Sequence, residues 1–425
     1  MGTAAPAAAG RRLAARGRGP PKGMSTEPEQ GARASDELAR FLLNVGSMTP
    51  DWAESFRAVP RAWFLPSLFW SHSMTTGTNT AVNRYEDPDE WEAQAHANVP
   101  IVTQWDDGKH LGTQPGAVPT SSASMPSVVV EMLRDLDVTE GMNVLEVGTG
   151  TGWNAGLLTR RLGGGNVVTV EVDPVVCVAA RTALSAHGLR PQVVRGDGAD
   201  GYVAAAPYDR VIVTAGVRQI PAEWLRQTRS GGVVLAPWGT HYANDDALVK
   251  LTVRADGSAS GPFLRPVAFM KLRDQRLDWG RFGNHVTHYP GDAEQSWTGL
   301  GPDDLGGQQQ FHPARLVVGM CVPGVAHVLN ATEAGVNAWF FSLDGPPSWA
   351  AVEFRRGEPA ATVYQHGPRR LWDEVERSLR WWADQGRPPV DRFGLTVTPS
   401  GAQRPWFADP TNAVPSFNTS VEGEG

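Results

Sequence analysis

The stretch VLEVGTGTGWNAGLL, residues 144–158, constrains the fold of this 425-residue chain more than any other segment. An apolar run that contains a glutamate leads through the alternate glycines Gly148, Gly150 and Gly152 into a helix-compatible segment. This order is typical of α/β proteins that bind nucleotides, because the turn lets the backbone approach the ligand. Dinucleotide sites have a third glycine where this chain has Trp153, and phosphate-binding loops need a lysine that the turn lacks. The turn therefore favours a nucleoside ligand without a phosphate chain.

The sequence around this turn alternates between strand-like and helix-like segments. Five short runs are rich in Val, Ile and Leu, with helix-compatible stretches between the first and the fourth: NVLEVG, NVVTVEV, PQVVRGD, DRVIVTAG and GGVVLAPWG. Such runs between amphipathic helices indicate parallel strands that are buried on both faces. The predicted fold is a doubly wound α/β, Rossmann-like domain over residues 36–240, which begins with helical segments up to Leu68.

A further helix is predicted just before the first of these strands, in MPSVVVEMLRDLDV. Ser124 is a plausible N-cap for this helix, and Pro126 is tolerated in a first helical turn. Apolar residues recur on one face at helical spacing: Val128, Met132, Leu133 and Leu136. The pattern indicates an amphipathic helix.

Three flanking regions differ from this domain in composition. Residues 1–35 are predicted to form a disordered basic tail, since the first 24 carry five basic and no acidic residues among Ala, Gly and Pro. Met24 is an alternative start. Residues 75–124 are polar and rich in Pro and Gly, which indicates a substrate loop or lid. Residues 247–425 are predicted to form an α+β extension that could recognise a peptide substrate.

Two elements stand out in this extension. The segment 247–273 is predicted to form a β-hairpin with ADGSASG as its turn region. A helix is predicted in PRRLWDEVERSLRWWADQGRPP, with one apolar face: Leu371, Val375, Leu379 and Trp382. The extension also holds eight of the sixteen tryptophans. An aromatic core is favoured as their explanation over an aromatic surface that binds a peptide.

The composition excludes several classes of protein and site. Cys177 and Cys321 are the only cysteines, too few for a disulfide framework or a thiolate zinc site, which fits a reducing cytoplasm. His285 and His288 have no matching ligands, so no metal is expected. The net charge of −7 disfavours nucleic acid, and no apolar stretch approaches the ~20 residues that span a bilayer. We expect a soluble cytoplasmic protein whose oligomeric state is left open.

Two acidic residues at the ends of successive strands narrow the ligand. Glu171 ends the second strand, where it can accept hydrogen bonds from both ribose hydroxyls, and Asp197 follows the third, where it can accept from an adenine amino group. Taken alone, each of these acids would most simply be a solvent-exposed residue at the end of a strand. Together with the glycine turn they predict a site for S-adenosylmethionine (SAM). The candidate cofactor-binding residues are Glu146, Gly148, Thr149, Gly150, Gly152, Asn154, Glu171, Val172, Gly196, Asp197 and Gly198.

Residues from about 55 to 240 resemble a protein-L-isoaspartate O-methyltransferase. The resemblance lies in motifs that occur in the order of that family: FRAVPRAWFLP, SMPSVVVEML, VLEVGTGTGWNAGLL, VEVDP, GDGADG, APYDRVIVTAG and IPAEWLRQTRSGGVVLAPWG. It implies a SAM-dependent methyltransferase in which the glycine turn, Glu171 and Asp197 hold SAM. It also places Ser124, in SMP, where the repair enzymes have a serine beside the methyl acceptor. Ser122 is the second candidate for contact with the acceptor.

The chain departs from this family in two places. It continues for about 180 residues beyond the last core strands, and a long insertion precedes Ser124. These features resemble actinobacterial relatives that occur with ribosomal peptide biosynthesis, of the lanthipeptide and ATP-grasp (graspetide) classes. The resemblance implies methylation of an aspartate in a modified precursor peptide, followed by collapse of the ester to a succinimide. Which of the two peptide classes applies is left open.

The chemistry expected needs no strong general base. A carboxylate with an ordinary pKa of ~3.9 is already ionised at neutral pH, so the site has only to align the two reactants. Asp106 and Asp107 in the inserted loop are most simply a solvated turn, although they could contact substrate if the loop closes as a lid. Alternatives to the precursor-peptide enzyme are general isoaspartate repair, a small-molecule methyltransferase, and a non-catalytic module that binds SAM or a leader peptide.

Overall fold

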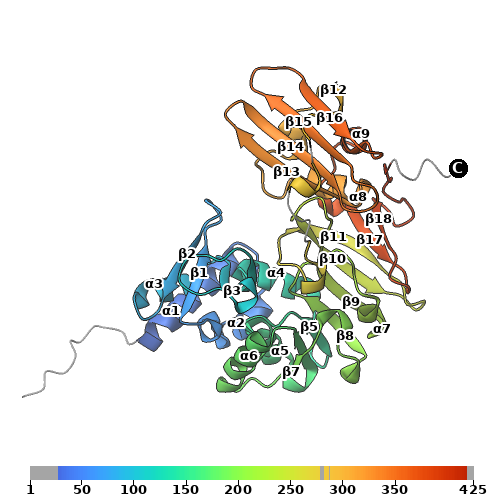
Figure 1. The fold of residues 1–425 in the computed structure, drawn as a ribbon. Coiled ribbons are helices and arrows are strands. Elements are labelled where there is room, and N and C mark those ends of the chain that lie inside the picture. Colours follow the sequence, from blue (N-terminus) through green and yellow to red (C-terminus); the bar gives the residue numbers. More distant parts are fainter. Residues whose placement is uncertain (1–26, 278–281, 287, 419–425) are drawn as a thin grey trace, which may run out of the picture.

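The five predicted strands form the parallel half of a nine-stranded sheet (Figure 1). The structure is a computed structural model that describes residues 27–277, 282–286 and 288–418. These strands are β5 (Val144–Val147), β6 (Val167–Glu171), β7 (Gln192–Arg195), β8 (Tyr208–Val213) and β9 (Thr228–Gly239). They are parallel neighbours in the order β9-β8-β5-β6-β7. The prediction of a doubly wound α/β fold is confirmed.

Both faces of this parallel half are covered, which explains the near-continuous apolar runs. Val144 of β5 belongs to one core, and its neighbour Leu145 belongs to the core on the other face. The first core contains residues of α1 (Glu27–Asn44), α2 (Ala53–Ala58), α4 (Pro126–Leu136), α5 (Trp153–Leu162) and α6 (Pro174–Ala186). The second contains Trp224 and Leu225 of α7 (Ala222–Arg226). Among the described residues, no helix combines the length and apolarity needed to cross a bilayer.

Residues 75–124 do not form the irregular loop that the sequence predicts. They contribute to an antiparallel four-stranded sheet in the order β2-β1-β3-β4: β1 (Leu68–His72), β2 (Asn79–Asn83), β3 (Ile101–Trp105) and β4 (Pro119–Ala123). Helix α3 (Pro88–Ala95) covers one face, where Trp91 packs with Phe69 and Ile101. The prediction was wrong because these strands are short, partly polar and separated by Pro- and Gly-rich turns. They are stabilised by pairing with one another and by packing against α3.

The nine-stranded sheet also continues beyond residue 240. Strands β10 (Asp246–Val253), β11 (Ala259–Val267), β17 (Phe393–Val397) and β18 (Gln403–Phe407) extend it with antiparallel neighbours, in the order β18-β17-β11-β10-β9. The predicted hairpin over 247–273 is confirmed as β10 and β11. Because β9 pairs with β10 from Asp246 to Thr252, the sheet runs through the domain boundary predicted between residues 240 and 247.

The rest of the extension forms a second sheet, drawn in orange in Figure 1. It is antiparallel, in the order β12-β16-β15-β14-β13: β12 (Glu294–Thr298), β13 (Val325–Thr332), β14 (Gly335–Ser342), β15 (Trp349–Arg355) and β16 (Ala361–His366). Helices α8 (Pro313–Cys321) and α9 (Leu371–Asp384) share a core with one of its faces. This core is continuous with that of the nine-stranded sheet, so the extension is packed onto the doubly wound domain rather than tethered to it.

The extension and the N-terminal tail match the prediction in some features and differ from it in others. The apolar face of α9 is buried as predicted. Of the eight tryptophans in the extension, five are buried, which supports the aromatic core: Trp339, Trp349, Trp372, Trp382 and Trp406. Trp297 is exposed, Trp381 is half-buried and Trp279 lies outside the described residues. The predicted tail lies outside them up to residue 26, but residues 27–35 belong to α1, because Leu38, Ala39 and Leu42 anchor this helix in the core.

Candidate functional site

A cavity of about 390 Å³ opens beside the carboxyl ends of β5, β6 and β8. All but two of the predicted site residues line it: Ser122, Ser124, Glu146, Gly148, Thr149, Gly150, Asn154, Glu171, Val172, Asp197 and Gly198. The carboxyl ends of parallel strands are where ligands bind in open α/β sheets. The structure thus brings the residues of three strand ends and of the inserted segment to one place, while their roles stay predictions.

Gly152 and Gly196 are the two predicted residues that do not line the cavity. Gly152 has a φ of +92°, and a Cβ there would lie 3.3 Å from Cβ of Ala180, so it permits α5 and α6 to approach. The amide of Gly196 donates to the carbonyl of Glu171 (3.0 Å) and continues the pairing of β6 and β7. Both glycines therefore shape the backbone around the site.

Glu171 is held by the backbone of the glycine turn. Its Oε2 accepts a hydrogen bond from the amide of Gly150 (2.9 Å), and its Oε1 accepts one from the amide of Asp173 (3.0 Å). Burial raises the pKa of this carboxyl, and the two amides act in the opposite direction. Asp197 is exposed, and its Oδ1 accepts from the amide of Ala199 (2.9 Å). Both carboxylates keep acceptor capacity toward a nucleoside, because a carboxylate offers about four lone-pair sites.

Glu146 and Asn154 form the buried end of the cavity. Glu146 is fully buried and accepts hydrogen bonds from Nδ2 of Asn154 (2.6 Å) and Oγ1 of Thr169 (2.5 Å). Oδ1 of Asn154 is buried without a hydrogen-bond partner within the described residues. A buried acceptor without a donor costs about 1–3 kcal/mol. A ligand that brings an N–H donor, such as the amino group of SAM, fits this end of the cavity.

Substitution of Glu146 by Gln is expected to change how stability depends on pH. Burial raises the pKa of Glu146 from 4.5 to about 7, against the hydrogen bonds from Thr169 and Asn154. Between these pH values the unfolded chain loses a proton that the native chain keeps, so the free energy of unfolding falls as pH rises. Between pH 4.5 and about 7, Glu146 should lower the free energy of unfolding by roughly 3 kcal/mol. The E146Q variant should not show this decrease. Urea unfolding at pH 4.5, 6 and 7.5 measures it.

The matched control for this experiment is Glu140→Gln, at an exposed position. Its unfolding free energy should follow the wild-type dependence on pH. If E146Q and the wild type keep a constant difference from pH 4.5 to 7.5, Glu146 is ionised in the native protein throughout and the expected shift is absent.

The two candidate serines lie where β4 leads into α4. The predicted N-cap role of Ser124 is wrong, because the cap position is Met125 and no side-chain hydrogen bond caps the helix. A Cβ on Gly150 would lie 3.4 Å from the carbonyl oxygen of Ser122, so β4 passes directly over the glycine turn. No hydrogen bond is recorded for either serine hydroxyl within the described part of the chain. Both serines line the cavity.

Arg61, from the motif VPRAW, fixes this serine segment in place. Its buried guanidinium donates from Nη2 to the carbonyl of Ala123 (2.8 Å), between the two serines, and to the carbonyl of Val99 (3.0 Å). It also lies over the ring of Trp153, the first residue of α5 (5.7 Å). Burial lowers the pKa of Arg61 to about 9. Arg61 is not among the site residues predicted from the sequence, although an arginine between the apolar residues of this motif was an available signal.

The structure adds two further walls to the cavity. One is the hairpin of β1 and β2, whose paired residues His72 and Asn79 line it. The other is the segment 268–276, which follows β11 and had been predicted only as part of a hairpin. Its basic residues in FMKLRDQR, within an acidic chain, were the available signal. Asp107 is not the solvated turn that was favoured, because it forms ion pairs with Arg273 (3.0 Å) and Arg276 (2.9 Å).

Comparison with known proteins finds one family to which this chain is similar. The family model described as protein-L-isoaspartate(D-aspartate) O-methyltransferase matches residues 90–277. A protein-L-isoaspartate O-methyltransferase of Methanococcus maripaludis is 41% identical over 143 residues, which span 33% of this chain and 66%, about two thirds, of that protein. The enzyme of the same name from Ignicoccus hospitalis is 33% identical over 242 residues, which span 56% of this chain and 97% of that protein.

A solved structure described as a protein-L-isoaspartate O-methyltransferase is also similar. It is 20% identical, with 88% of this chain and 100% of that chain covered and a TM-score of 0.49. The sequence matches decide the assignment, because the Ignicoccus relative aligns over nearly its whole length. By these matches, the chain belongs to the protein-L-isoaspartate O-methyltransferase family of SAM-dependent carboxyl methyltransferases.

Proposed function

We propose that this chain methylates the carboxylate of an isoaspartyl residue in a protein or peptide, with SAM as the methyl donor. The family and the names of its relatives support this activity. The observation that carries it is the meeting of Ser122 and Ser124 with the glycine turn in one cavity. An acceptor carboxylate bound by the serines would lie beside a cofactor bound by the turn.

SAM supplies an electrophilic methyl group on a positively charged sulfur. In the proposal, Glu171 accepts hydrogen bonds from the ribose hydroxyls, and Asp197 accepts one from the adenine amino group. Asn154 accepts a hydrogen bond from the amino group of the methionine moiety through its unpartnered Oδ1. The amide of Gly150 holds Glu171 in place for this contact.

The acceptor is a carboxylate that is already ionised at neutral pH. The hydroxyls of Ser122 and Ser124 would each donate a hydrogen bond to it and aim one oxygen at the methyl group. Arg61 holds the backbone between them, so the two donors are fixed before the substrate binds. Alignment of reactants alone supplies up to ~7–11 kcal/mol, which agrees with a site that needs no general base.

Methylation of a short isoaspartyl peptide tests this proposal. The wild type should transfer a methyl group to this peptide and not to the same peptide with a normal aspartate. Ser124→Ala should lower kcat about 10- to 100-fold, the value of one hydrogen bond to a charged group, and leave SAM affinity unchanged. Transfer is measured by mass spectrometry and affinity by calorimetry.

Ser127→Ala is the matched control, since Ser127 lies three residues further along and does not line the cavity. Its turnover should equal that of the wild type. Full turnover in Ser124→Ala would rule out the role of this hydroxyl. SAM binding without transfer to any carboxylate would favour the non-catalytic alternative.

A modified ribosomal precursor peptide is the second candidate substrate. The observation in its favour is the additional wall that β1 and β2 give to the cavity, with His72 and Asn79, together with the packed extension. A lanthipeptide or graspetide with an aspartate acceptor should then gain a methyl group and lose methanol, for a net loss of water. A stable methyl ester, or methylation of isoaspartyl peptides alone, would exclude this version.

A further inference from the structure

Three segments that are distant in sequence meet beside the cavity, which Arg273 and Arg276 line. Asp107 belongs to the turn after β3, Arg273 and Arg276 to the segment after β11, and Asp173 to the N-cap of α6. Nη2 of Arg273 lies 3.0 Å from Oδ1 of Asp107 and 3.3 Å from Oδ2 of Asp173. Arg273 therefore bridges the inserted substrate segment and the strand end that carries Glu171.

Arg276 differs from its neighbour in one respect. Its Nη1 contacts both oxygens of Asp107, at 2.9 and 3.1 Å, and no contact with Asp173 is recorded within the described residues. The two side chains are similarly exposed, at 28% for Arg276 and 34% for Arg273. Of these two arginines, only Arg273 has a buried Nε without a hydrogen-bond partner in the described part of the chain. Both arginines thus contact Asp107, and only Arg273 also contacts Asp173, beside the proposed cofactor site.

The contact with Asp173 leads on to the ribose carboxylate. The amide of Asp173 donates to Oε1 of Glu171, whose Oε2 accepts from Gly150 in the glycine turn. The positive charge of Arg273 also opposes the rise that burial causes in the pKa of Glu171. Arg273 thereby favours the ionised form of Glu171, which is the form that accepts two ribose hydroxyls.

On the other side, the contact with Asp107 fixes a strained turn. Asp106 and Asp107 have φ values of +52° and +53°, which non-glycine residues seldom adopt. The amide of Asp107 donates to Oγ1 of Thr120 (3.1 Å), and Thr120 lies in β4, two residues before Ser122. A second connection runs from Thr120 through Gln104 to Asp173, at 2.8 and 3.5 Å. The position of the serine strand is therefore tied to the same carboxylate network.

We propose that Arg273 is a positioning residue that couples the cofactor site to the substrate segment. It holds Asp173 and Glu171 in the geometry that receives the ribose, and it holds Asp107 so that residues 105–120 close over the cavity. Bound cofactor and the closed segment stabilise each other through this side chain. The inference rests on the cofactor assignment of the proposed function.

The test is calorimetric titration of S-adenosylhomocysteine into Arg273→Gln and Arg276→Gln. Arg273→Gln should bind about tenfold more weakly than the wild type, the scale of one charge-assisted contact that is partly screened by water. Arg276→Gln, which loses only the contact with Asp107, should change the affinity less than about threefold. Equal affinity in Arg273→Gln and the wild type would overturn the proposal.

Hydrogen exchange of residues 105–120 supplies the second readout. S-adenosylhomocysteine should slow exchange there in the wild type and have no such effect in Arg273→Gln. Asp107→Asn, which leaves the contact with Asp173 intact, should lose the slowing and should lose less affinity than Arg273→Gln. Protection that persists in both variants would refute the coupling even if affinities change. Similar melting temperatures for the two arginine variants show that folding is not the cause.

These outcomes are distinct from failure of the proposed function. A wild type that binds no S-adenosylhomocysteine overturns the cofactor assignment and this inference together. A wild type that binds it but does not methylate isoaspartyl peptides disproves only the substrate assignment. In that case the difference between Arg273→Gln and Arg276→Gln still decides the role of Arg273.

Discussion

Glu171→Ala is expected to weaken binding of S-adenosylhomocysteine at least about 100-fold, which corresponds to about 2.7 kcal/mol. Each hydrogen bond to a charged group contributes about 1.5–3 kcal/mol, and the proposed contact with the ribose comprises two of them. The substitution also removes the acceptor of the Gly150 and Asp173 amides, so the glycine turn loses its support. Calorimetry at neutral pH measures the affinity.

Two further variants serve as comparisons for Glu171→Ala. Glu171→Gln keeps one oxygen acceptor and should lose less affinity than Glu171→Ala. Asp200→Ala removes an exposed acid two residues beyond the Asp197–Gly198 wall, and its affinity should equal that of the wild type. If Glu171→Ala binds as tightly as Asp200→Ala, the ribose is held elsewhere and the assignment of this strand end is wrong.

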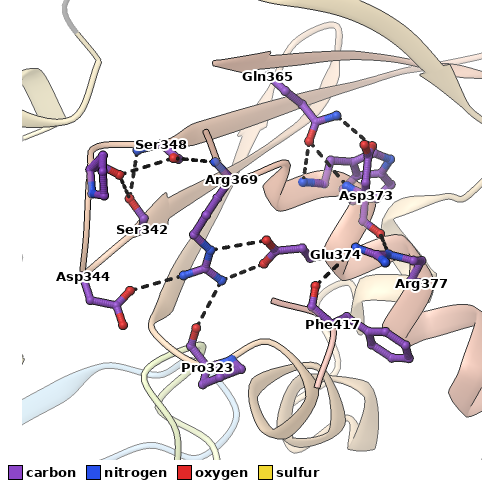
Figure 2. A network of polar contacts seen from close by, with 12 residues as sticks. Pro323, Ser342, Asp344, Ser348, Gln365, Arg369, Asp373, Glu374, Arg377 and Phe417 are labelled. Carbon is purple, nitrogen blue, oxygen red and sulfur yellow. Dashed lines mark hydrogen bonds and ion pairs between the residues drawn. The ribbon is translucent and has the colours of Figure 1, made fainter. Parts of the chain in front are cut away.

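Glu374→Ala is expected to lower the free energy of unfolding by about 3–5 kcal/mol, because it leaves a buried arginine without its partner. Figure 2 shows Arg369 at the centre of this network in the extension. Its Nη2 lies 2.6 Å from Oε2 of Glu374 and its Nε 3.3 Å from Oε1, and the two side chains are 4% and 0% exposed. The guanidinium also donates to the carbonyl of Pro323 (3.2 Å). Urea unfolding followed by circular dichroism measures the loss.

Asp344→Ala is the matched control, because Asp344 contacts the same guanidinium (3.2 Å) but is 68% exposed. It should cost less than about 1 kcal/mol. The double variant with Arg369→Met and Glu374→Leu should recover most of the stability, since apolar residues of similar volume can replace a buried pair. A Glu374→Ala protein as stable as Asp344→Ala would show that Arg369 finds another partner or water.

The parallel half of the sheet could be predicted because its signals are local. Each strand is a continuous apolar run buried on both faces, and the glycines between β5 and α5 leave few alternatives for the turn. Glu171 and Asp197 are placed by the same rule, since both lie at carboxyl ends of parallel strands. The acceptor side could be assigned only through resemblance, because two serines in a polar segment carry no pattern of their own.

The rest of the site depends on contacts between distant segments. Arg61 contacts Ala123, Arg273 contacts Asp107, and His72 lines the same cavity as Ser122, each across a separation that no periodicity in the sequence encodes. The four-stranded sheet escaped prediction for the same reason. Its strands are short and partly polar. Strand β1 pairs with β3, although β2 and α3 lie between them in the sequence.

The sequence by itself determined the glycine turn, the parallel strands and the acidic strand ends. These follow from the conformational needs of single residues and from the burial of each apolar run. Only the tertiary structure decided what encloses the ligand. Pairing of β9 with β10 makes the extension part of the same sheet, and this brings the segment after β11, with Arg273, over the cavity. The physical reason is that pairing and ion pairs between distant segments depend on their final positions in space.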